Sequence, residues 1–594
     1  MNATTDVRKA QVSYRKLAFL SNGLTAAMEL EGSIDWFPCP RFDSPSIFSR
    51  ILDKEKGGYF SLRPAGRYRL NSSYVKDTLV LRNVFTTTGG VLETKDFMPL
   101  SLSGIMRVYR SSVPFVLDIK PMFKYGLAAP EPRERESGII FKNKESMEAL
   151  EVVIRGRYSL ISGHRIRMER GSGSVFALYS KDIRYGLFSN AGFVYPEPGE
   201  ALSNTVNYWR TQLSLAQKVP VHMGAYSRSI AVVLGMIYAP SGAIIAAPTT
   251  SLPEITGKGR NWDYRYLWIR DASYAAEALA CAGYLSKARR IIDFMLSVLD
   301  PASKSFDHPL YSIDGTPPSP ERTLYWLAGS RGSGPVRTGN SAYMQVQMDI
   351  EGEFMNALYA YLKLSNDLSY AIESWWAVEA ITKWVGKAWR LKSTSLWEEH
   401  EERRHYVHTN VMQWVAVDRA RLIATMIGYA EKARELGKVG DEIRSDVLSK
   451  GFSKKANSFV KYYGSTEVDA SLLTLPLYGF IKADDPRFLS TLERIERELL
   501  AAPGLLLRYR SDFLGEVLHP FTLLSTWLAR VYLRTGERKK AEDTISALLE
   551  RSTELQLLGE HVDVRTSEPM GNLPQLFPHA GLVQALSEFR RIEL

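Results

Sequence analysis

The most informative stretch of this 594-residue chain is NWDYRYLWIRD, at residues 261–271. It sets two tryptophans and two tyrosines among two arginines and two aspartates. Aromatic rings cover the apolar faces of a ligand, whereas guanidinium and carboxylate groups satisfy directed hydrogen bonds around its rim. A pyranose has both kinds of surface, so the stretch predicts a sugar-binding site. A buried helix start with ion-paired side chains would have the same composition, and it stands as the alternative.

The chain upstream of this stretch has the pattern of a β-sandwich. Short runs of β-branched and aromatic residues follow one another at roughly 8–12 residue spacing, separated by turn-forming residues. Examples lie at residues 58–62, 78–81, 91–94, 115–117 and 138–141. The Pro-containing segment at residues 128–134 is predicted to be a loop.

The chain downstream has a helical pattern, because its apolar residues recur every three or four positions. Such runs lie at residues 275–280, 287–295, 354–362 and 523–532. Three glycines, Gly283, Gly437 and Gly536, are expected to end helices.

The length of the chain favours more than one domain. We expect a β-sandwich domain at residues 1–214, a linker or helix at residues 215–240, and a helical catalytic domain at residues 241–594. The helices of the last part are of a size that could pair as inner and outer layers.

Composition argues against several classes of function. The net charge of +10 arises from lysines and arginines spread along the chain, which indicates a solvated surface and no nucleic-acid partner. No apolar run reaches about eighteen residues, and the N-terminal residues lack the apolar core of a signal peptide. We therefore expect a cytoplasmic protein with no membrane partner; the sequence predicts no oligomeric state. Cys39 and Cys281 are too few for a disulfide framework or a metal site.

The balance of polar residues indicates a hot habitat. The chain has 15 Asn and 9 Gln against 75 Lys+Arg and 65 Asp+Glu. Few thermolabile amides among many ionisable groups are typical of thermophilic proteins.

Two carboxylates at breaks in the helical pattern are candidates for acid–base chemistry. Glycosidic bond cleavage needs one protonated carboxyl and one carboxylate that acts on water. Glu398 follows Trp397, whose indole could desolvate the carboxyl and raise its pKa. Glu560 precedes His561 and lies near Asp563, polar neighbours beside which a base would stay ionised. In a chain with 65 acidic residues, a solvated helix end is the alternative for each of these glutamates.

A series of ordered motifs resembles glycoside hydrolase family fifteen, the inverting exo-glucosidases that include glucoamylases and prokaryotic trehalases. The motifs lie at residues 22–27, 32–37, 40–45, 246–254, 261–271, 335–340, 397–398, 404–408, 469–473, 508–509 and 571–575. The resemblance extends over nearly the whole chain. The resemblance implies an N-terminal antiparallel β-supersandwich followed by an (α/α)6 barrel, with no cofactor and no metal.

The same resemblance implies roles for individual residues. It identifies Glu398 as the general acid and Glu560 as the general base. Residues implied to bind the sugars are Tyr264, Trp268, Arg270, Asp271, Trp397, Glu399 and Arg508. Trp326, Arg337 and Asn340 are expected near the entrance, although a core position is as good an interpretation for Trp326.

Two departures from the family pattern bear on the substrate. They are the segment around Glu516 and the histidine His561 after the base, and both are expected near the subsite of the leaving sugar. Our first interpretation is a glucoamylase-type exo-α-glucosidase that releases β-glucose from maltooligosaccharides. The alternatives are an α,α-trehalase of the same family and an inactive carbohydrate-binding relative. The expected partner is in each case an α-glucoside.

Overall fold

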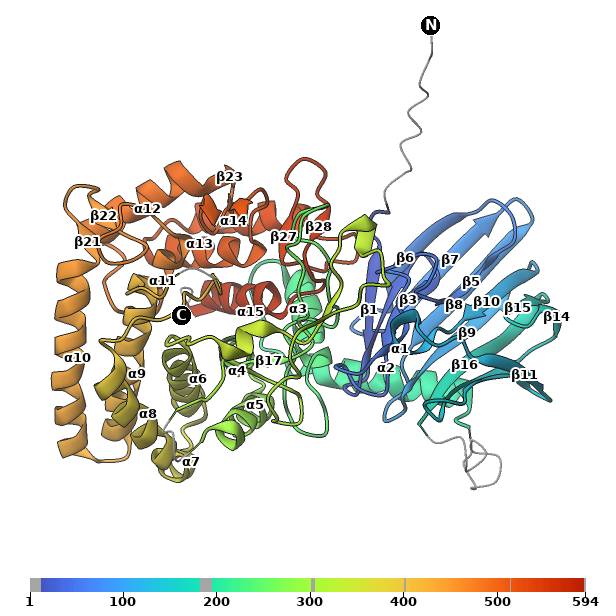
Figure 1. The fold of residues 1–594 in the computed structure, drawn as a ribbon, viewed down its shortest axis with the longest axis horizontal. Coiled ribbons are helices and arrows are strands. Elements are labelled where there is room, and N and C mark those ends of the chain that lie inside the picture. The colour runs from blue at the N-terminus through green and yellow to red at the C-terminus, as the bar shows by residue number, and fades with distance from the viewer. Residues whose placement is uncertain (1–11, 182–194, 301–304, 400–401, 513, 592–594) are drawn as a thin grey trace, which may run out of the picture.

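The structure is a computed structural model that describes residues 12–181, 195–300, 305–399, 402–512 and 514–591. It consists of a two-sheet β-sandwich beside a body of helices (Figure 1). Strands therefore precede helices, as the periodicity predicts.

The first sheet of the sandwich packs against the helical body. Its strands in spatial order are β1 (Leu17–Ser21), β2 (Ala26–Leu30), β3 (Ser33–Pro38), β5 (Tyr59–Pro64), β10 (Phe115–Lys120), β15 (Arg165–Met168) and β14 (Tyr158–Ser162), with β4 (Ser46–Phe48) on β3. The indole Nε1 of Trp36 donates to the carbonyl of Pro248 at 2.7 Å, and Ser21 Oγ donates to the carbonyl of Gly235 at 2.6 Å. These buried bonds join the sandwich to the helical half.

The second sheet covers the outer face of the first. Its strands in spatial order are β11 (Glu131–Arg135), β12 (Gly138–Asn143), β13 (Glu148–Arg155), β16 (Gly171–Ser180), β9 (Gly104–Ser111), β8 (Gly90–Phe97), β7 (Leu81–Thr87) and β6 (Arg69–Tyr74). The short α1 (Phe123–Gly126) follows β10. Alternating residues of both sheets form the core between them; β10, for example, alternates buried and half-buried side chains along its length.

Two of the local predictions in this half are wrong. Residues 131–135 form β11, within the segment predicted as a loop. All five side chains of this edge strand are exposed, and Pro132 is tolerated because an edge strand leaves backbone N–H groups unpaired. Of residues 78–81 only Leu81 belongs to a strand, because Thr78 Oγ1 accepts from the Val80 amide and donates to the Val75 carbonyl, which closes a turn.

The helical half is an (α/α)6 barrel, with six inner helices in the described residues. These are α4 (Ile269–Cys281), α6 (Ile350–Ser365), α9 (Val407–Met426), α11 (Thr474–Leu477), α13 (Thr522–Arg534) and α15 (Leu576–Arg591). Each packs on the next, and α15 packs on α4 to close the ring. Nearly every side chain of α4 and α13 is buried, as expected for helices enclosed on all sides.

The outer helices bury only one face. They are α3 (Met223–Gly235), α5 (Leu285–Val298), α8 (Trp375–Ala388), α10 (Ala430–Lys450), α12 (Pro486–Leu499) and α14 (Arg538–Glu550), with α2 (Pro198–Ser214) before the barrel and α7 (Leu368–Glu373) beside α8. The exception is α3, which the sandwich covers. Gly283 and Gly536 follow helices with positive φ, whereas Gly437 lies inside α10, where one glycine costs about 1 kcal/mol.

Short two-stranded ribbons connect the helices at the ends of the barrel. They pair β17 (Leu267–Trp268) with β18 (Leu310–Tyr311), β19 (Arg322–Thr323) with β20 (Arg337–Thr338), β21 (Phe452–Ser453) with β22 (Ser458–Phe459), β23 (Leu500–Ala502) with β24 (Leu505–Leu506), β25 (Ser511–Asp512) with β26 (Gly515–Glu516), and β27 (His561–Val562) with β28 (Pro569–Met570). Three of them, β17, β25 and β27, carry or adjoin the residues of the site described below.

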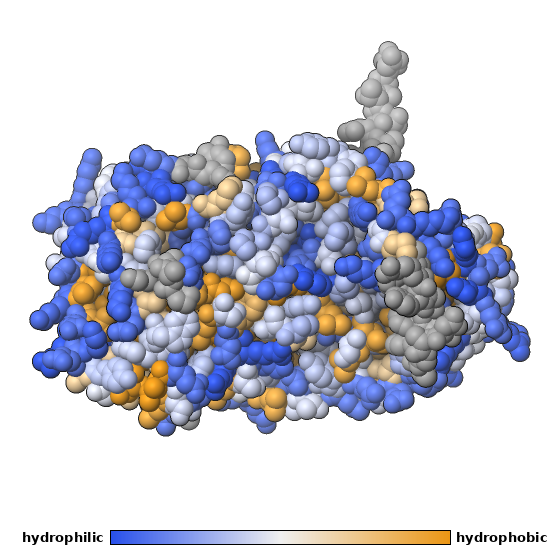
Figure 2. Space-filling view, turned by 60° about the horizontal axis from the view of Figure 1, so that its bottom comes forward, coloured by the Kyte–Doolittle hydropathy of each residue, from blue (hydrophilic) through white to orange (hydrophobic). Residues whose placement is uncertain are grey.

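The outer surface is polar over the face shown in Figure 2, where hydrophobic side chains form only scattered patches. None of the described helices has both the length and the hydropathy that a transmembrane span requires.

Candidate active site

Two adjoining cavities bring the predicted site residues together. They contain about 470 and 510 Å³ of space free of protein atoms, part of it open to solvent. The first cavity is lined by Ala246, Tyr264, Trp268, Arg270, Asp271, Leu396, Trp397, Glu398, Arg508, Phe521, Glu560, Gln575 and Phe577. The second is lined by Glu254, Arg260, Trp262, Tyr264, Asn340, Ser341, Ala342, Gln345, Trp397, Glu398, Glu399, Arg508, Tyr509, Asp512 and Leu514. All nine predicted catalytic and binding residues therefore line one or both cavities.

The stretch at residues 261–271 contacts both candidate catalytic carboxyls. The hydroxyl of Tyr264 donates to Glu560 Oε1 at 2.8 Å, and the indole Nε1 of Trp268 donates to Glu398 Oε1 at 2.7 Å. The two rings meet edge to face with centroids 5.5 Å apart. One short segment thus holds both candidate carboxyls and lines the first cavity with aromatic surface.

Buried charged side chains hold this segment in place near its N-terminal end. Asp263 and Arg265 form a buried ion pair at 2.7 Å. Arg265 Nη1 donates to the carbonyl of Ser44 at 2.8 Å, and its Nη2 donates to the hydroxyl of Tyr125. Both acceptors belong to the β-sandwich. The residues around Phe42, which include Ser44, therefore support this segment on the side away from the cavities. They line neither cavity.

Glu398 is held in an unusual backbone conformation. Its φ of 60° lies in the left-handed region, which non-glycine residues occupy only when their surroundings impose it. Gln347 Nε2 donates to its Oε1 at 3.1 Å, and Gln345 Nε2 donates to its carbonyl at 3.2 Å. Arg270 Nη1 lies 3.8 Å from the same Oε1. These contacts aim the carboxyl between the two cavities.

Arg270 and Asp271 open the first turn of α4. Arg270 Nε donates to Asp349 Oδ2 at 2.7 Å, within a buried ion pair, and its Nη2 donates to Gln347. Burial raises the pKa of Asp271 to about 7, against the lowering effect of Arg270. Both residues line the first cavity, where a cation and a carboxyl can bond to sugar hydroxyls.

The neighbours of Glu398 in sequence have other partners. The indole of Trp397 donates to Asp469 Oδ2 at 2.7 Å, so the indole that bonds to Glu398 belongs to Trp268 and not to Trp397. Glu399 is buried and ion-paired with Lys461 at 2.5 Å. Glu399 still lines the second cavity, with its charge already neutralised.

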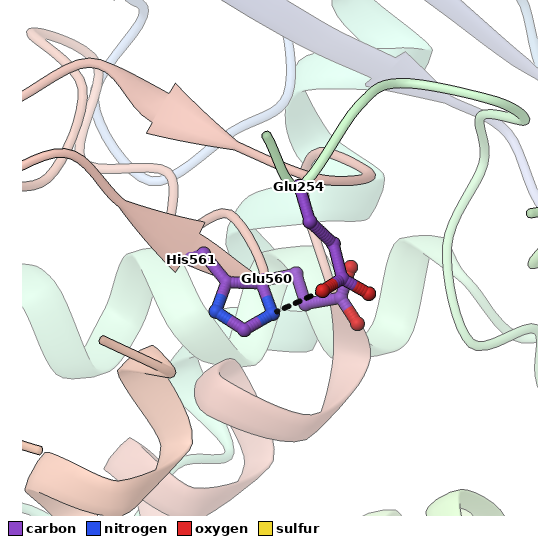
Figure 3. A group of neighbouring side chains, drawn as sticks. All are labelled: Glu254, Glu560 and His561. Atoms are coloured by element: carbon purple, nitrogen blue, oxygen red, sulfur yellow. Dashed lines mark ion pairs between the residues drawn. The ribbon is translucent and has the colours of Figure 1, made fainter. Parts of the chain in front are cut away.

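Glu560 lies in a buried cluster of ionisable groups (Figure 3). Ligand atoms of Glu254, Glu560 and His561 all lie within 4.8 Å of one another. Burial, and then the negative charge of Glu254, raise the pKa of Glu560 well above its usual range. Burial therefore acts against the polar neighbours expected to keep this carboxyl ionised, and Arg508 and Tyr264 are the groups that lower its pKa. Gly571 packs against it so closely that a Cβ there would lie 2.4 Å from Glu560 Oε2.

Arg508 lines both cavities and pairs with Glu254, whose Oε2 accepts from its Nη2 at 2.7 Å. Its Nε is buried and has no hydrogen-bond partner within the described ranges. An arginine with a donor left over beside a cavity is suited to binding a ligand.

Of the residues expected at the entrance, only one lines a cavity in the structure. Asn340 lines the second cavity, whereas Trp326 donates to the Tyr125 carbonyl and Arg337 pairs with Glu321, and neither lines a cavity. For Trp326 the core interpretation is the better one.

The two departures from the family pattern also lie differently from what the sequence suggested. Glu516 is exposed on β26 and lines neither cavity, and the acid of this ribbon at the second cavity is Asp512, buried against Arg260. His561 lines neither cavity and contacts Glu254.

Sequence reasoning missed Glu254, Gln347 and Asp512 as site residues. Glu254 lies at the end of a quoted motif and Asp512 four residues after Arg508, so position in the chain was an available signal for both. Gln347 carried no such signal.

Comparison with known proteins agrees with this geometry. The sequence profile of glycosyl hydrolases family 15 matches residues 220–551, and a trehalase-like N-terminal profile matches residues 8–146. The chain belongs to glycosyl hydrolases family 15. This family 15 member is therefore an enzyme that hydrolyses glycosidic bonds.

Among curated relatives of this family 15 enzyme, Trehalase 2 of Sulfolobus acidocaldarius is 52% identical over 97% of this chain and 99% of its own length. Trehalase of Thermoplasma acidophilum is 35% identical over 93% of this chain and 96% of its own. A crystal structure of bacterial glucoamylase complexed with acarbose matches with a TM-score of 0.75 at 14% identity, covering 98% of this chain and 94% of the other. That match establishes the supersandwich and barrel fold.

Proposed function

We propose that this family 15 enzyme is an α,α-trehalase. The observation that carries the proposal is the 52% identity with a trehalase over almost the full length of both chains. The glucoamylase-type activity that we expected first has weaker support, because the bacterial glucoamylase is 14% identical and its likeness concerns the fold alone.

The two cavities fit a disaccharide. They are similar in volume and share Tyr264, Trp397, Glu398 and Arg508 along their common boundary. In trehalose two glucose units of equal size are joined by one oxygen. With one glucose unit in each cavity, that oxygen would lie beside Glu398, which lines both cavities.

The reaction that we infer is a single displacement with inversion. Glu398 gives its proton to the glycosidic oxygen as the bond to the anomeric carbon breaks. Glu560 takes a proton from the water that attacks the same carbon from the opposite face. The products are β-glucose from the first cavity and α-glucose from the second. Arg270, Asp271 and Arg508 supply hydrogen bonds that hold the ring during its distortion.

The second cavity limits the leaving sugar to one unit. Arg260 and Asp512 form an ion pair on its wall in which both side chains are 3% exposed. Tyr509 donates to Asp512 Oδ2 at 2.8 Å and fixes the pair from one side. A longer α-glucan would have to displace these side chains.

The test is proton NMR of the first turnover with trehalose, maltotriose and soluble starch in separate samples. We expect rapid hydrolysis of trehalose, with β-glucose and α-glucose appearing in equal amounts before mutarotation. Glucose release from maltotriose or starch that matches or exceeds the rate with trehalose would instead establish a glucoamylase-type enzyme. Two α-glucose molecules from trehalose would contradict inversion.

The matched variant is Glu560→Gln, which keeps the shape of the side chain and removes its ability to take up a proton. General base catalysis contributes about 10²–10⁴-fold to a reaction rate, so the rate of trehalose hydrolysis should decrease by a factor in that range. An unchanged rate would remove Glu560 from the mechanism.

A further inference from the structure

Glu254 lies at the centre of the buried charge cluster beside the base. Its Oε2 accepts from Arg508 Nη2 at 2.7 Å and lies 3.5 Å from His561 Nε2. Behind it Arg260 forms an ion pair with Asp512. Glu254 itself is 4% exposed and lines the second cavity. Tyr264, which lines the same cavity and binds the base, is a further titratable group near it.

His561 contributes an acceptor to this cluster and no charge. Its Nδ1 lies 3.0 Å from the carbonyl of His519, and a carbonyl can only accept, so Nδ1 carries the proton. Burial and Arg508 lower the pKa of His561 well below its usual range, which keeps the ring neutral. Its Nε2 is therefore a buried lone pair, with no hydrogen-bond partner in the described part of the chain.

A metal ion is a poor occupant of this cluster, although the ligand types would suit one. The oxygen of Glu254 that faces His561 already accepts from the guanidinium of Arg508. A divalent cation there would lie directly beside that fixed positive charge. A carboxylate held by an arginine explains the same geometry without a second cation.

The base faces the other side of the same cluster. Glu560 accepts a hydrogen bond from Tyr264, and the charges that act on it are those of Glu254, Arg508 and Glu398. Glu254 and Glu560 are carboxylates on two different loops with ligand atoms within 4.8 Å. Two carboxylates this close in a buried site strongly favour a proton on one of them.

We propose that Glu254 is a positioning residue of this enzyme: held by Arg508 and packed beside His561, its carboxylate engages the guanidinium of Arg508 and places a second negative charge next to the base Glu560. This inference rests on the proposed role of Glu560. Arg508 is committed to Glu254, so its positive charge is not fully available to Glu560. Removal of the Glu254 charge leaves Arg508 to act on Glu560 alone.

The direction of the effect follows from the charges. Glu560 must be ionised to accept a proton from water, so its pKa sets the acid limb of the dependence of kcat/KM on pH. The negative charge of Glu254 raises that pKa. Glu254→Gln removes this repulsion and frees the Arg508 charge, and both changes lower the pKa of Glu560. The acid limb should therefore move to lower pH.

The experiment measures kcat/KM for trehalose against pH in the wild type and in Glu254→Gln. The amide oxygen can still accept from Arg508, so the hydrogen bond that holds this side chain is kept while its charge is removed. We expect the acid limb to move down by about one pH unit or more. An acid limb that stays in place, or moves to higher pH, overturns the proposal, because a merely structural glutamate would not shift it downward.

Two further variants sharpen the result. Glu588→Gln removes a largely buried carboxylate from an arginine pair outside both cavities, and its acid limb should stay at the wild-type pH. Glu254→Asp keeps the negative charge but moves it farther from Glu560, because the aspartate side chain is shorter. The acid limb of this variant should therefore lie between those of the wild type and Glu254→Gln. If Glu254→Gln fails to give the wild-type circular dichroism spectrum, Glu254→Asp decides, and a limb at or above the wild-type pH then overturns the proposal.

The proposed role of the base is tested separately by Glu560→Gln. If that variant keeps full activity, the proposed function fails at its base. If it loses activity while Glu254→Gln shows an unmoved acid limb, the role of Glu254 alone is wrong.

Discussion

The protein buries two arginine–carboxylate clusters, one in the sandwich and one in the barrel, and they differ in what is left unbonded. In the sandwich, Arg107 gives Nε and Nη2 to Asp96 at 3.0 and 2.9 Å and Nη1 to two backbone carbonyls at 3.1 Å. Glu29 completes this cluster, and all three side chains are fully buried. In the barrel, Arg508 has one bonded partner, Glu254, and keeps a buried Nε free of partners within the described residues.

The difference separates a structural cluster from a functional one. Burial raises the pKa of one carboxyl in each, Glu29 in the sandwich and Glu560 in the barrel, and in each a neighbouring carboxylate adds to the effect. A shifted pKa is therefore common to both clusters. In the sandwich the unbonded atom, Glu29 Oε2, is fully enclosed, whereas in the barrel the unbonded Arg508 Nε belongs to a side chain that lines both cavities, and that combination indicates ligand chemistry.

The largest expected effect comes from Arg107→Leu. It leaves two carboxyls buried without their cation, which costs about 3–5 kcal/mol of unfolding free energy. Equilibrium urea unfolding measures the loss, and KM for trehalose in the folded fraction should not change. The matched variant Arg508→Leu should instead raise KM or lower kcat. A changed KM in Arg107→Leu would contradict the separation of the two clusters.

The next effect is expected at Gly571. Its φ of 75° and the distance of 2.4 Å from a built Cβ to Glu560 Oε2 leave no room for a side chain. Gly571→Ala must displace the base, and a displacement of about 1 Å costs about 10²-fold in rate. We expect kcat to fall by that factor, with the far-ultraviolet circular dichroism unchanged. Wild-type kcat in this variant would show that the location of Glu560 is not critical.

A smaller loss is expected from Trp268→Phe, which keeps an aromatic ring in the first cavity and removes the indole N–H that bonds to Glu398. A hydrogen bond to a neutral carboxyl contributes about 0.5–1.5 kcal/mol, and Gln347 still donates to the same oxygen. We therefore expect kcat/KM to fall by about tenfold. Trp397→Phe is the control, because its indole bonds to Asp469 and not to Glu398, and it should lower kcat/KM by less than Trp268→Phe does.

The smallest effect is expected from Glu29→Gln. Burial, followed by the charge of Asp96, raises the folded-state pKa of Glu29 well above the unfolded value, so this carboxyl is protonated over a pH range in which the unfolded chain is ionised. Its stabilisation is complete below the unfolded pKa and is lost as pH rises through the folded pKa. Glutamine removes this pH dependence, and we expect a change of about 1 kcal/mol or less at acidic pH. Urea unfolding at a series of pH values measures it, and an unaltered slope with pH would contradict it.

The sequence predicts the order of the two halves and which residues line the cavities. It does not predict the hydrogen bonds that these residues make. The aromatic composition of residues 261–271 predicts a sugar-binding site, and the resemblance to family fifteen implies that Tyr264 and Trp268 belong to it. Their bonds to Glu560 and Glu398 span 296 and 130 residues of chain, so no local pattern could reveal them. Trp397 is adjacent to Glu398 in sequence, yet the left-handed backbone at Glu398 turns the carboxyl towards another indole.

Errors elsewhere have the same origin. The prolines at residues 130 and 132 favour a loop, and the edge position that makes Pro132 compatible with β11 is a property of the whole sheet. Glu254 is one of 65 acidic residues, and its importance comes from Arg508 and His561, which lie about 250 and 300 residues further along.

One feature of the site bears on its behaviour when heated. Tyr264 and Trp268 hold the two catalytic carboxyls from positions only four residues apart on one buried segment. The separation of these anchors is set by covalent geometry, which hardly expands with temperature, and not by the docking of one domain on another. The gap for the attacking water should therefore keep its width until the barrel unfolds. An Arrhenius plot of kcat is expected to stay straight up to the onset of thermal unfolding, in keeping with a chain that is poor in asparagine and glutamine.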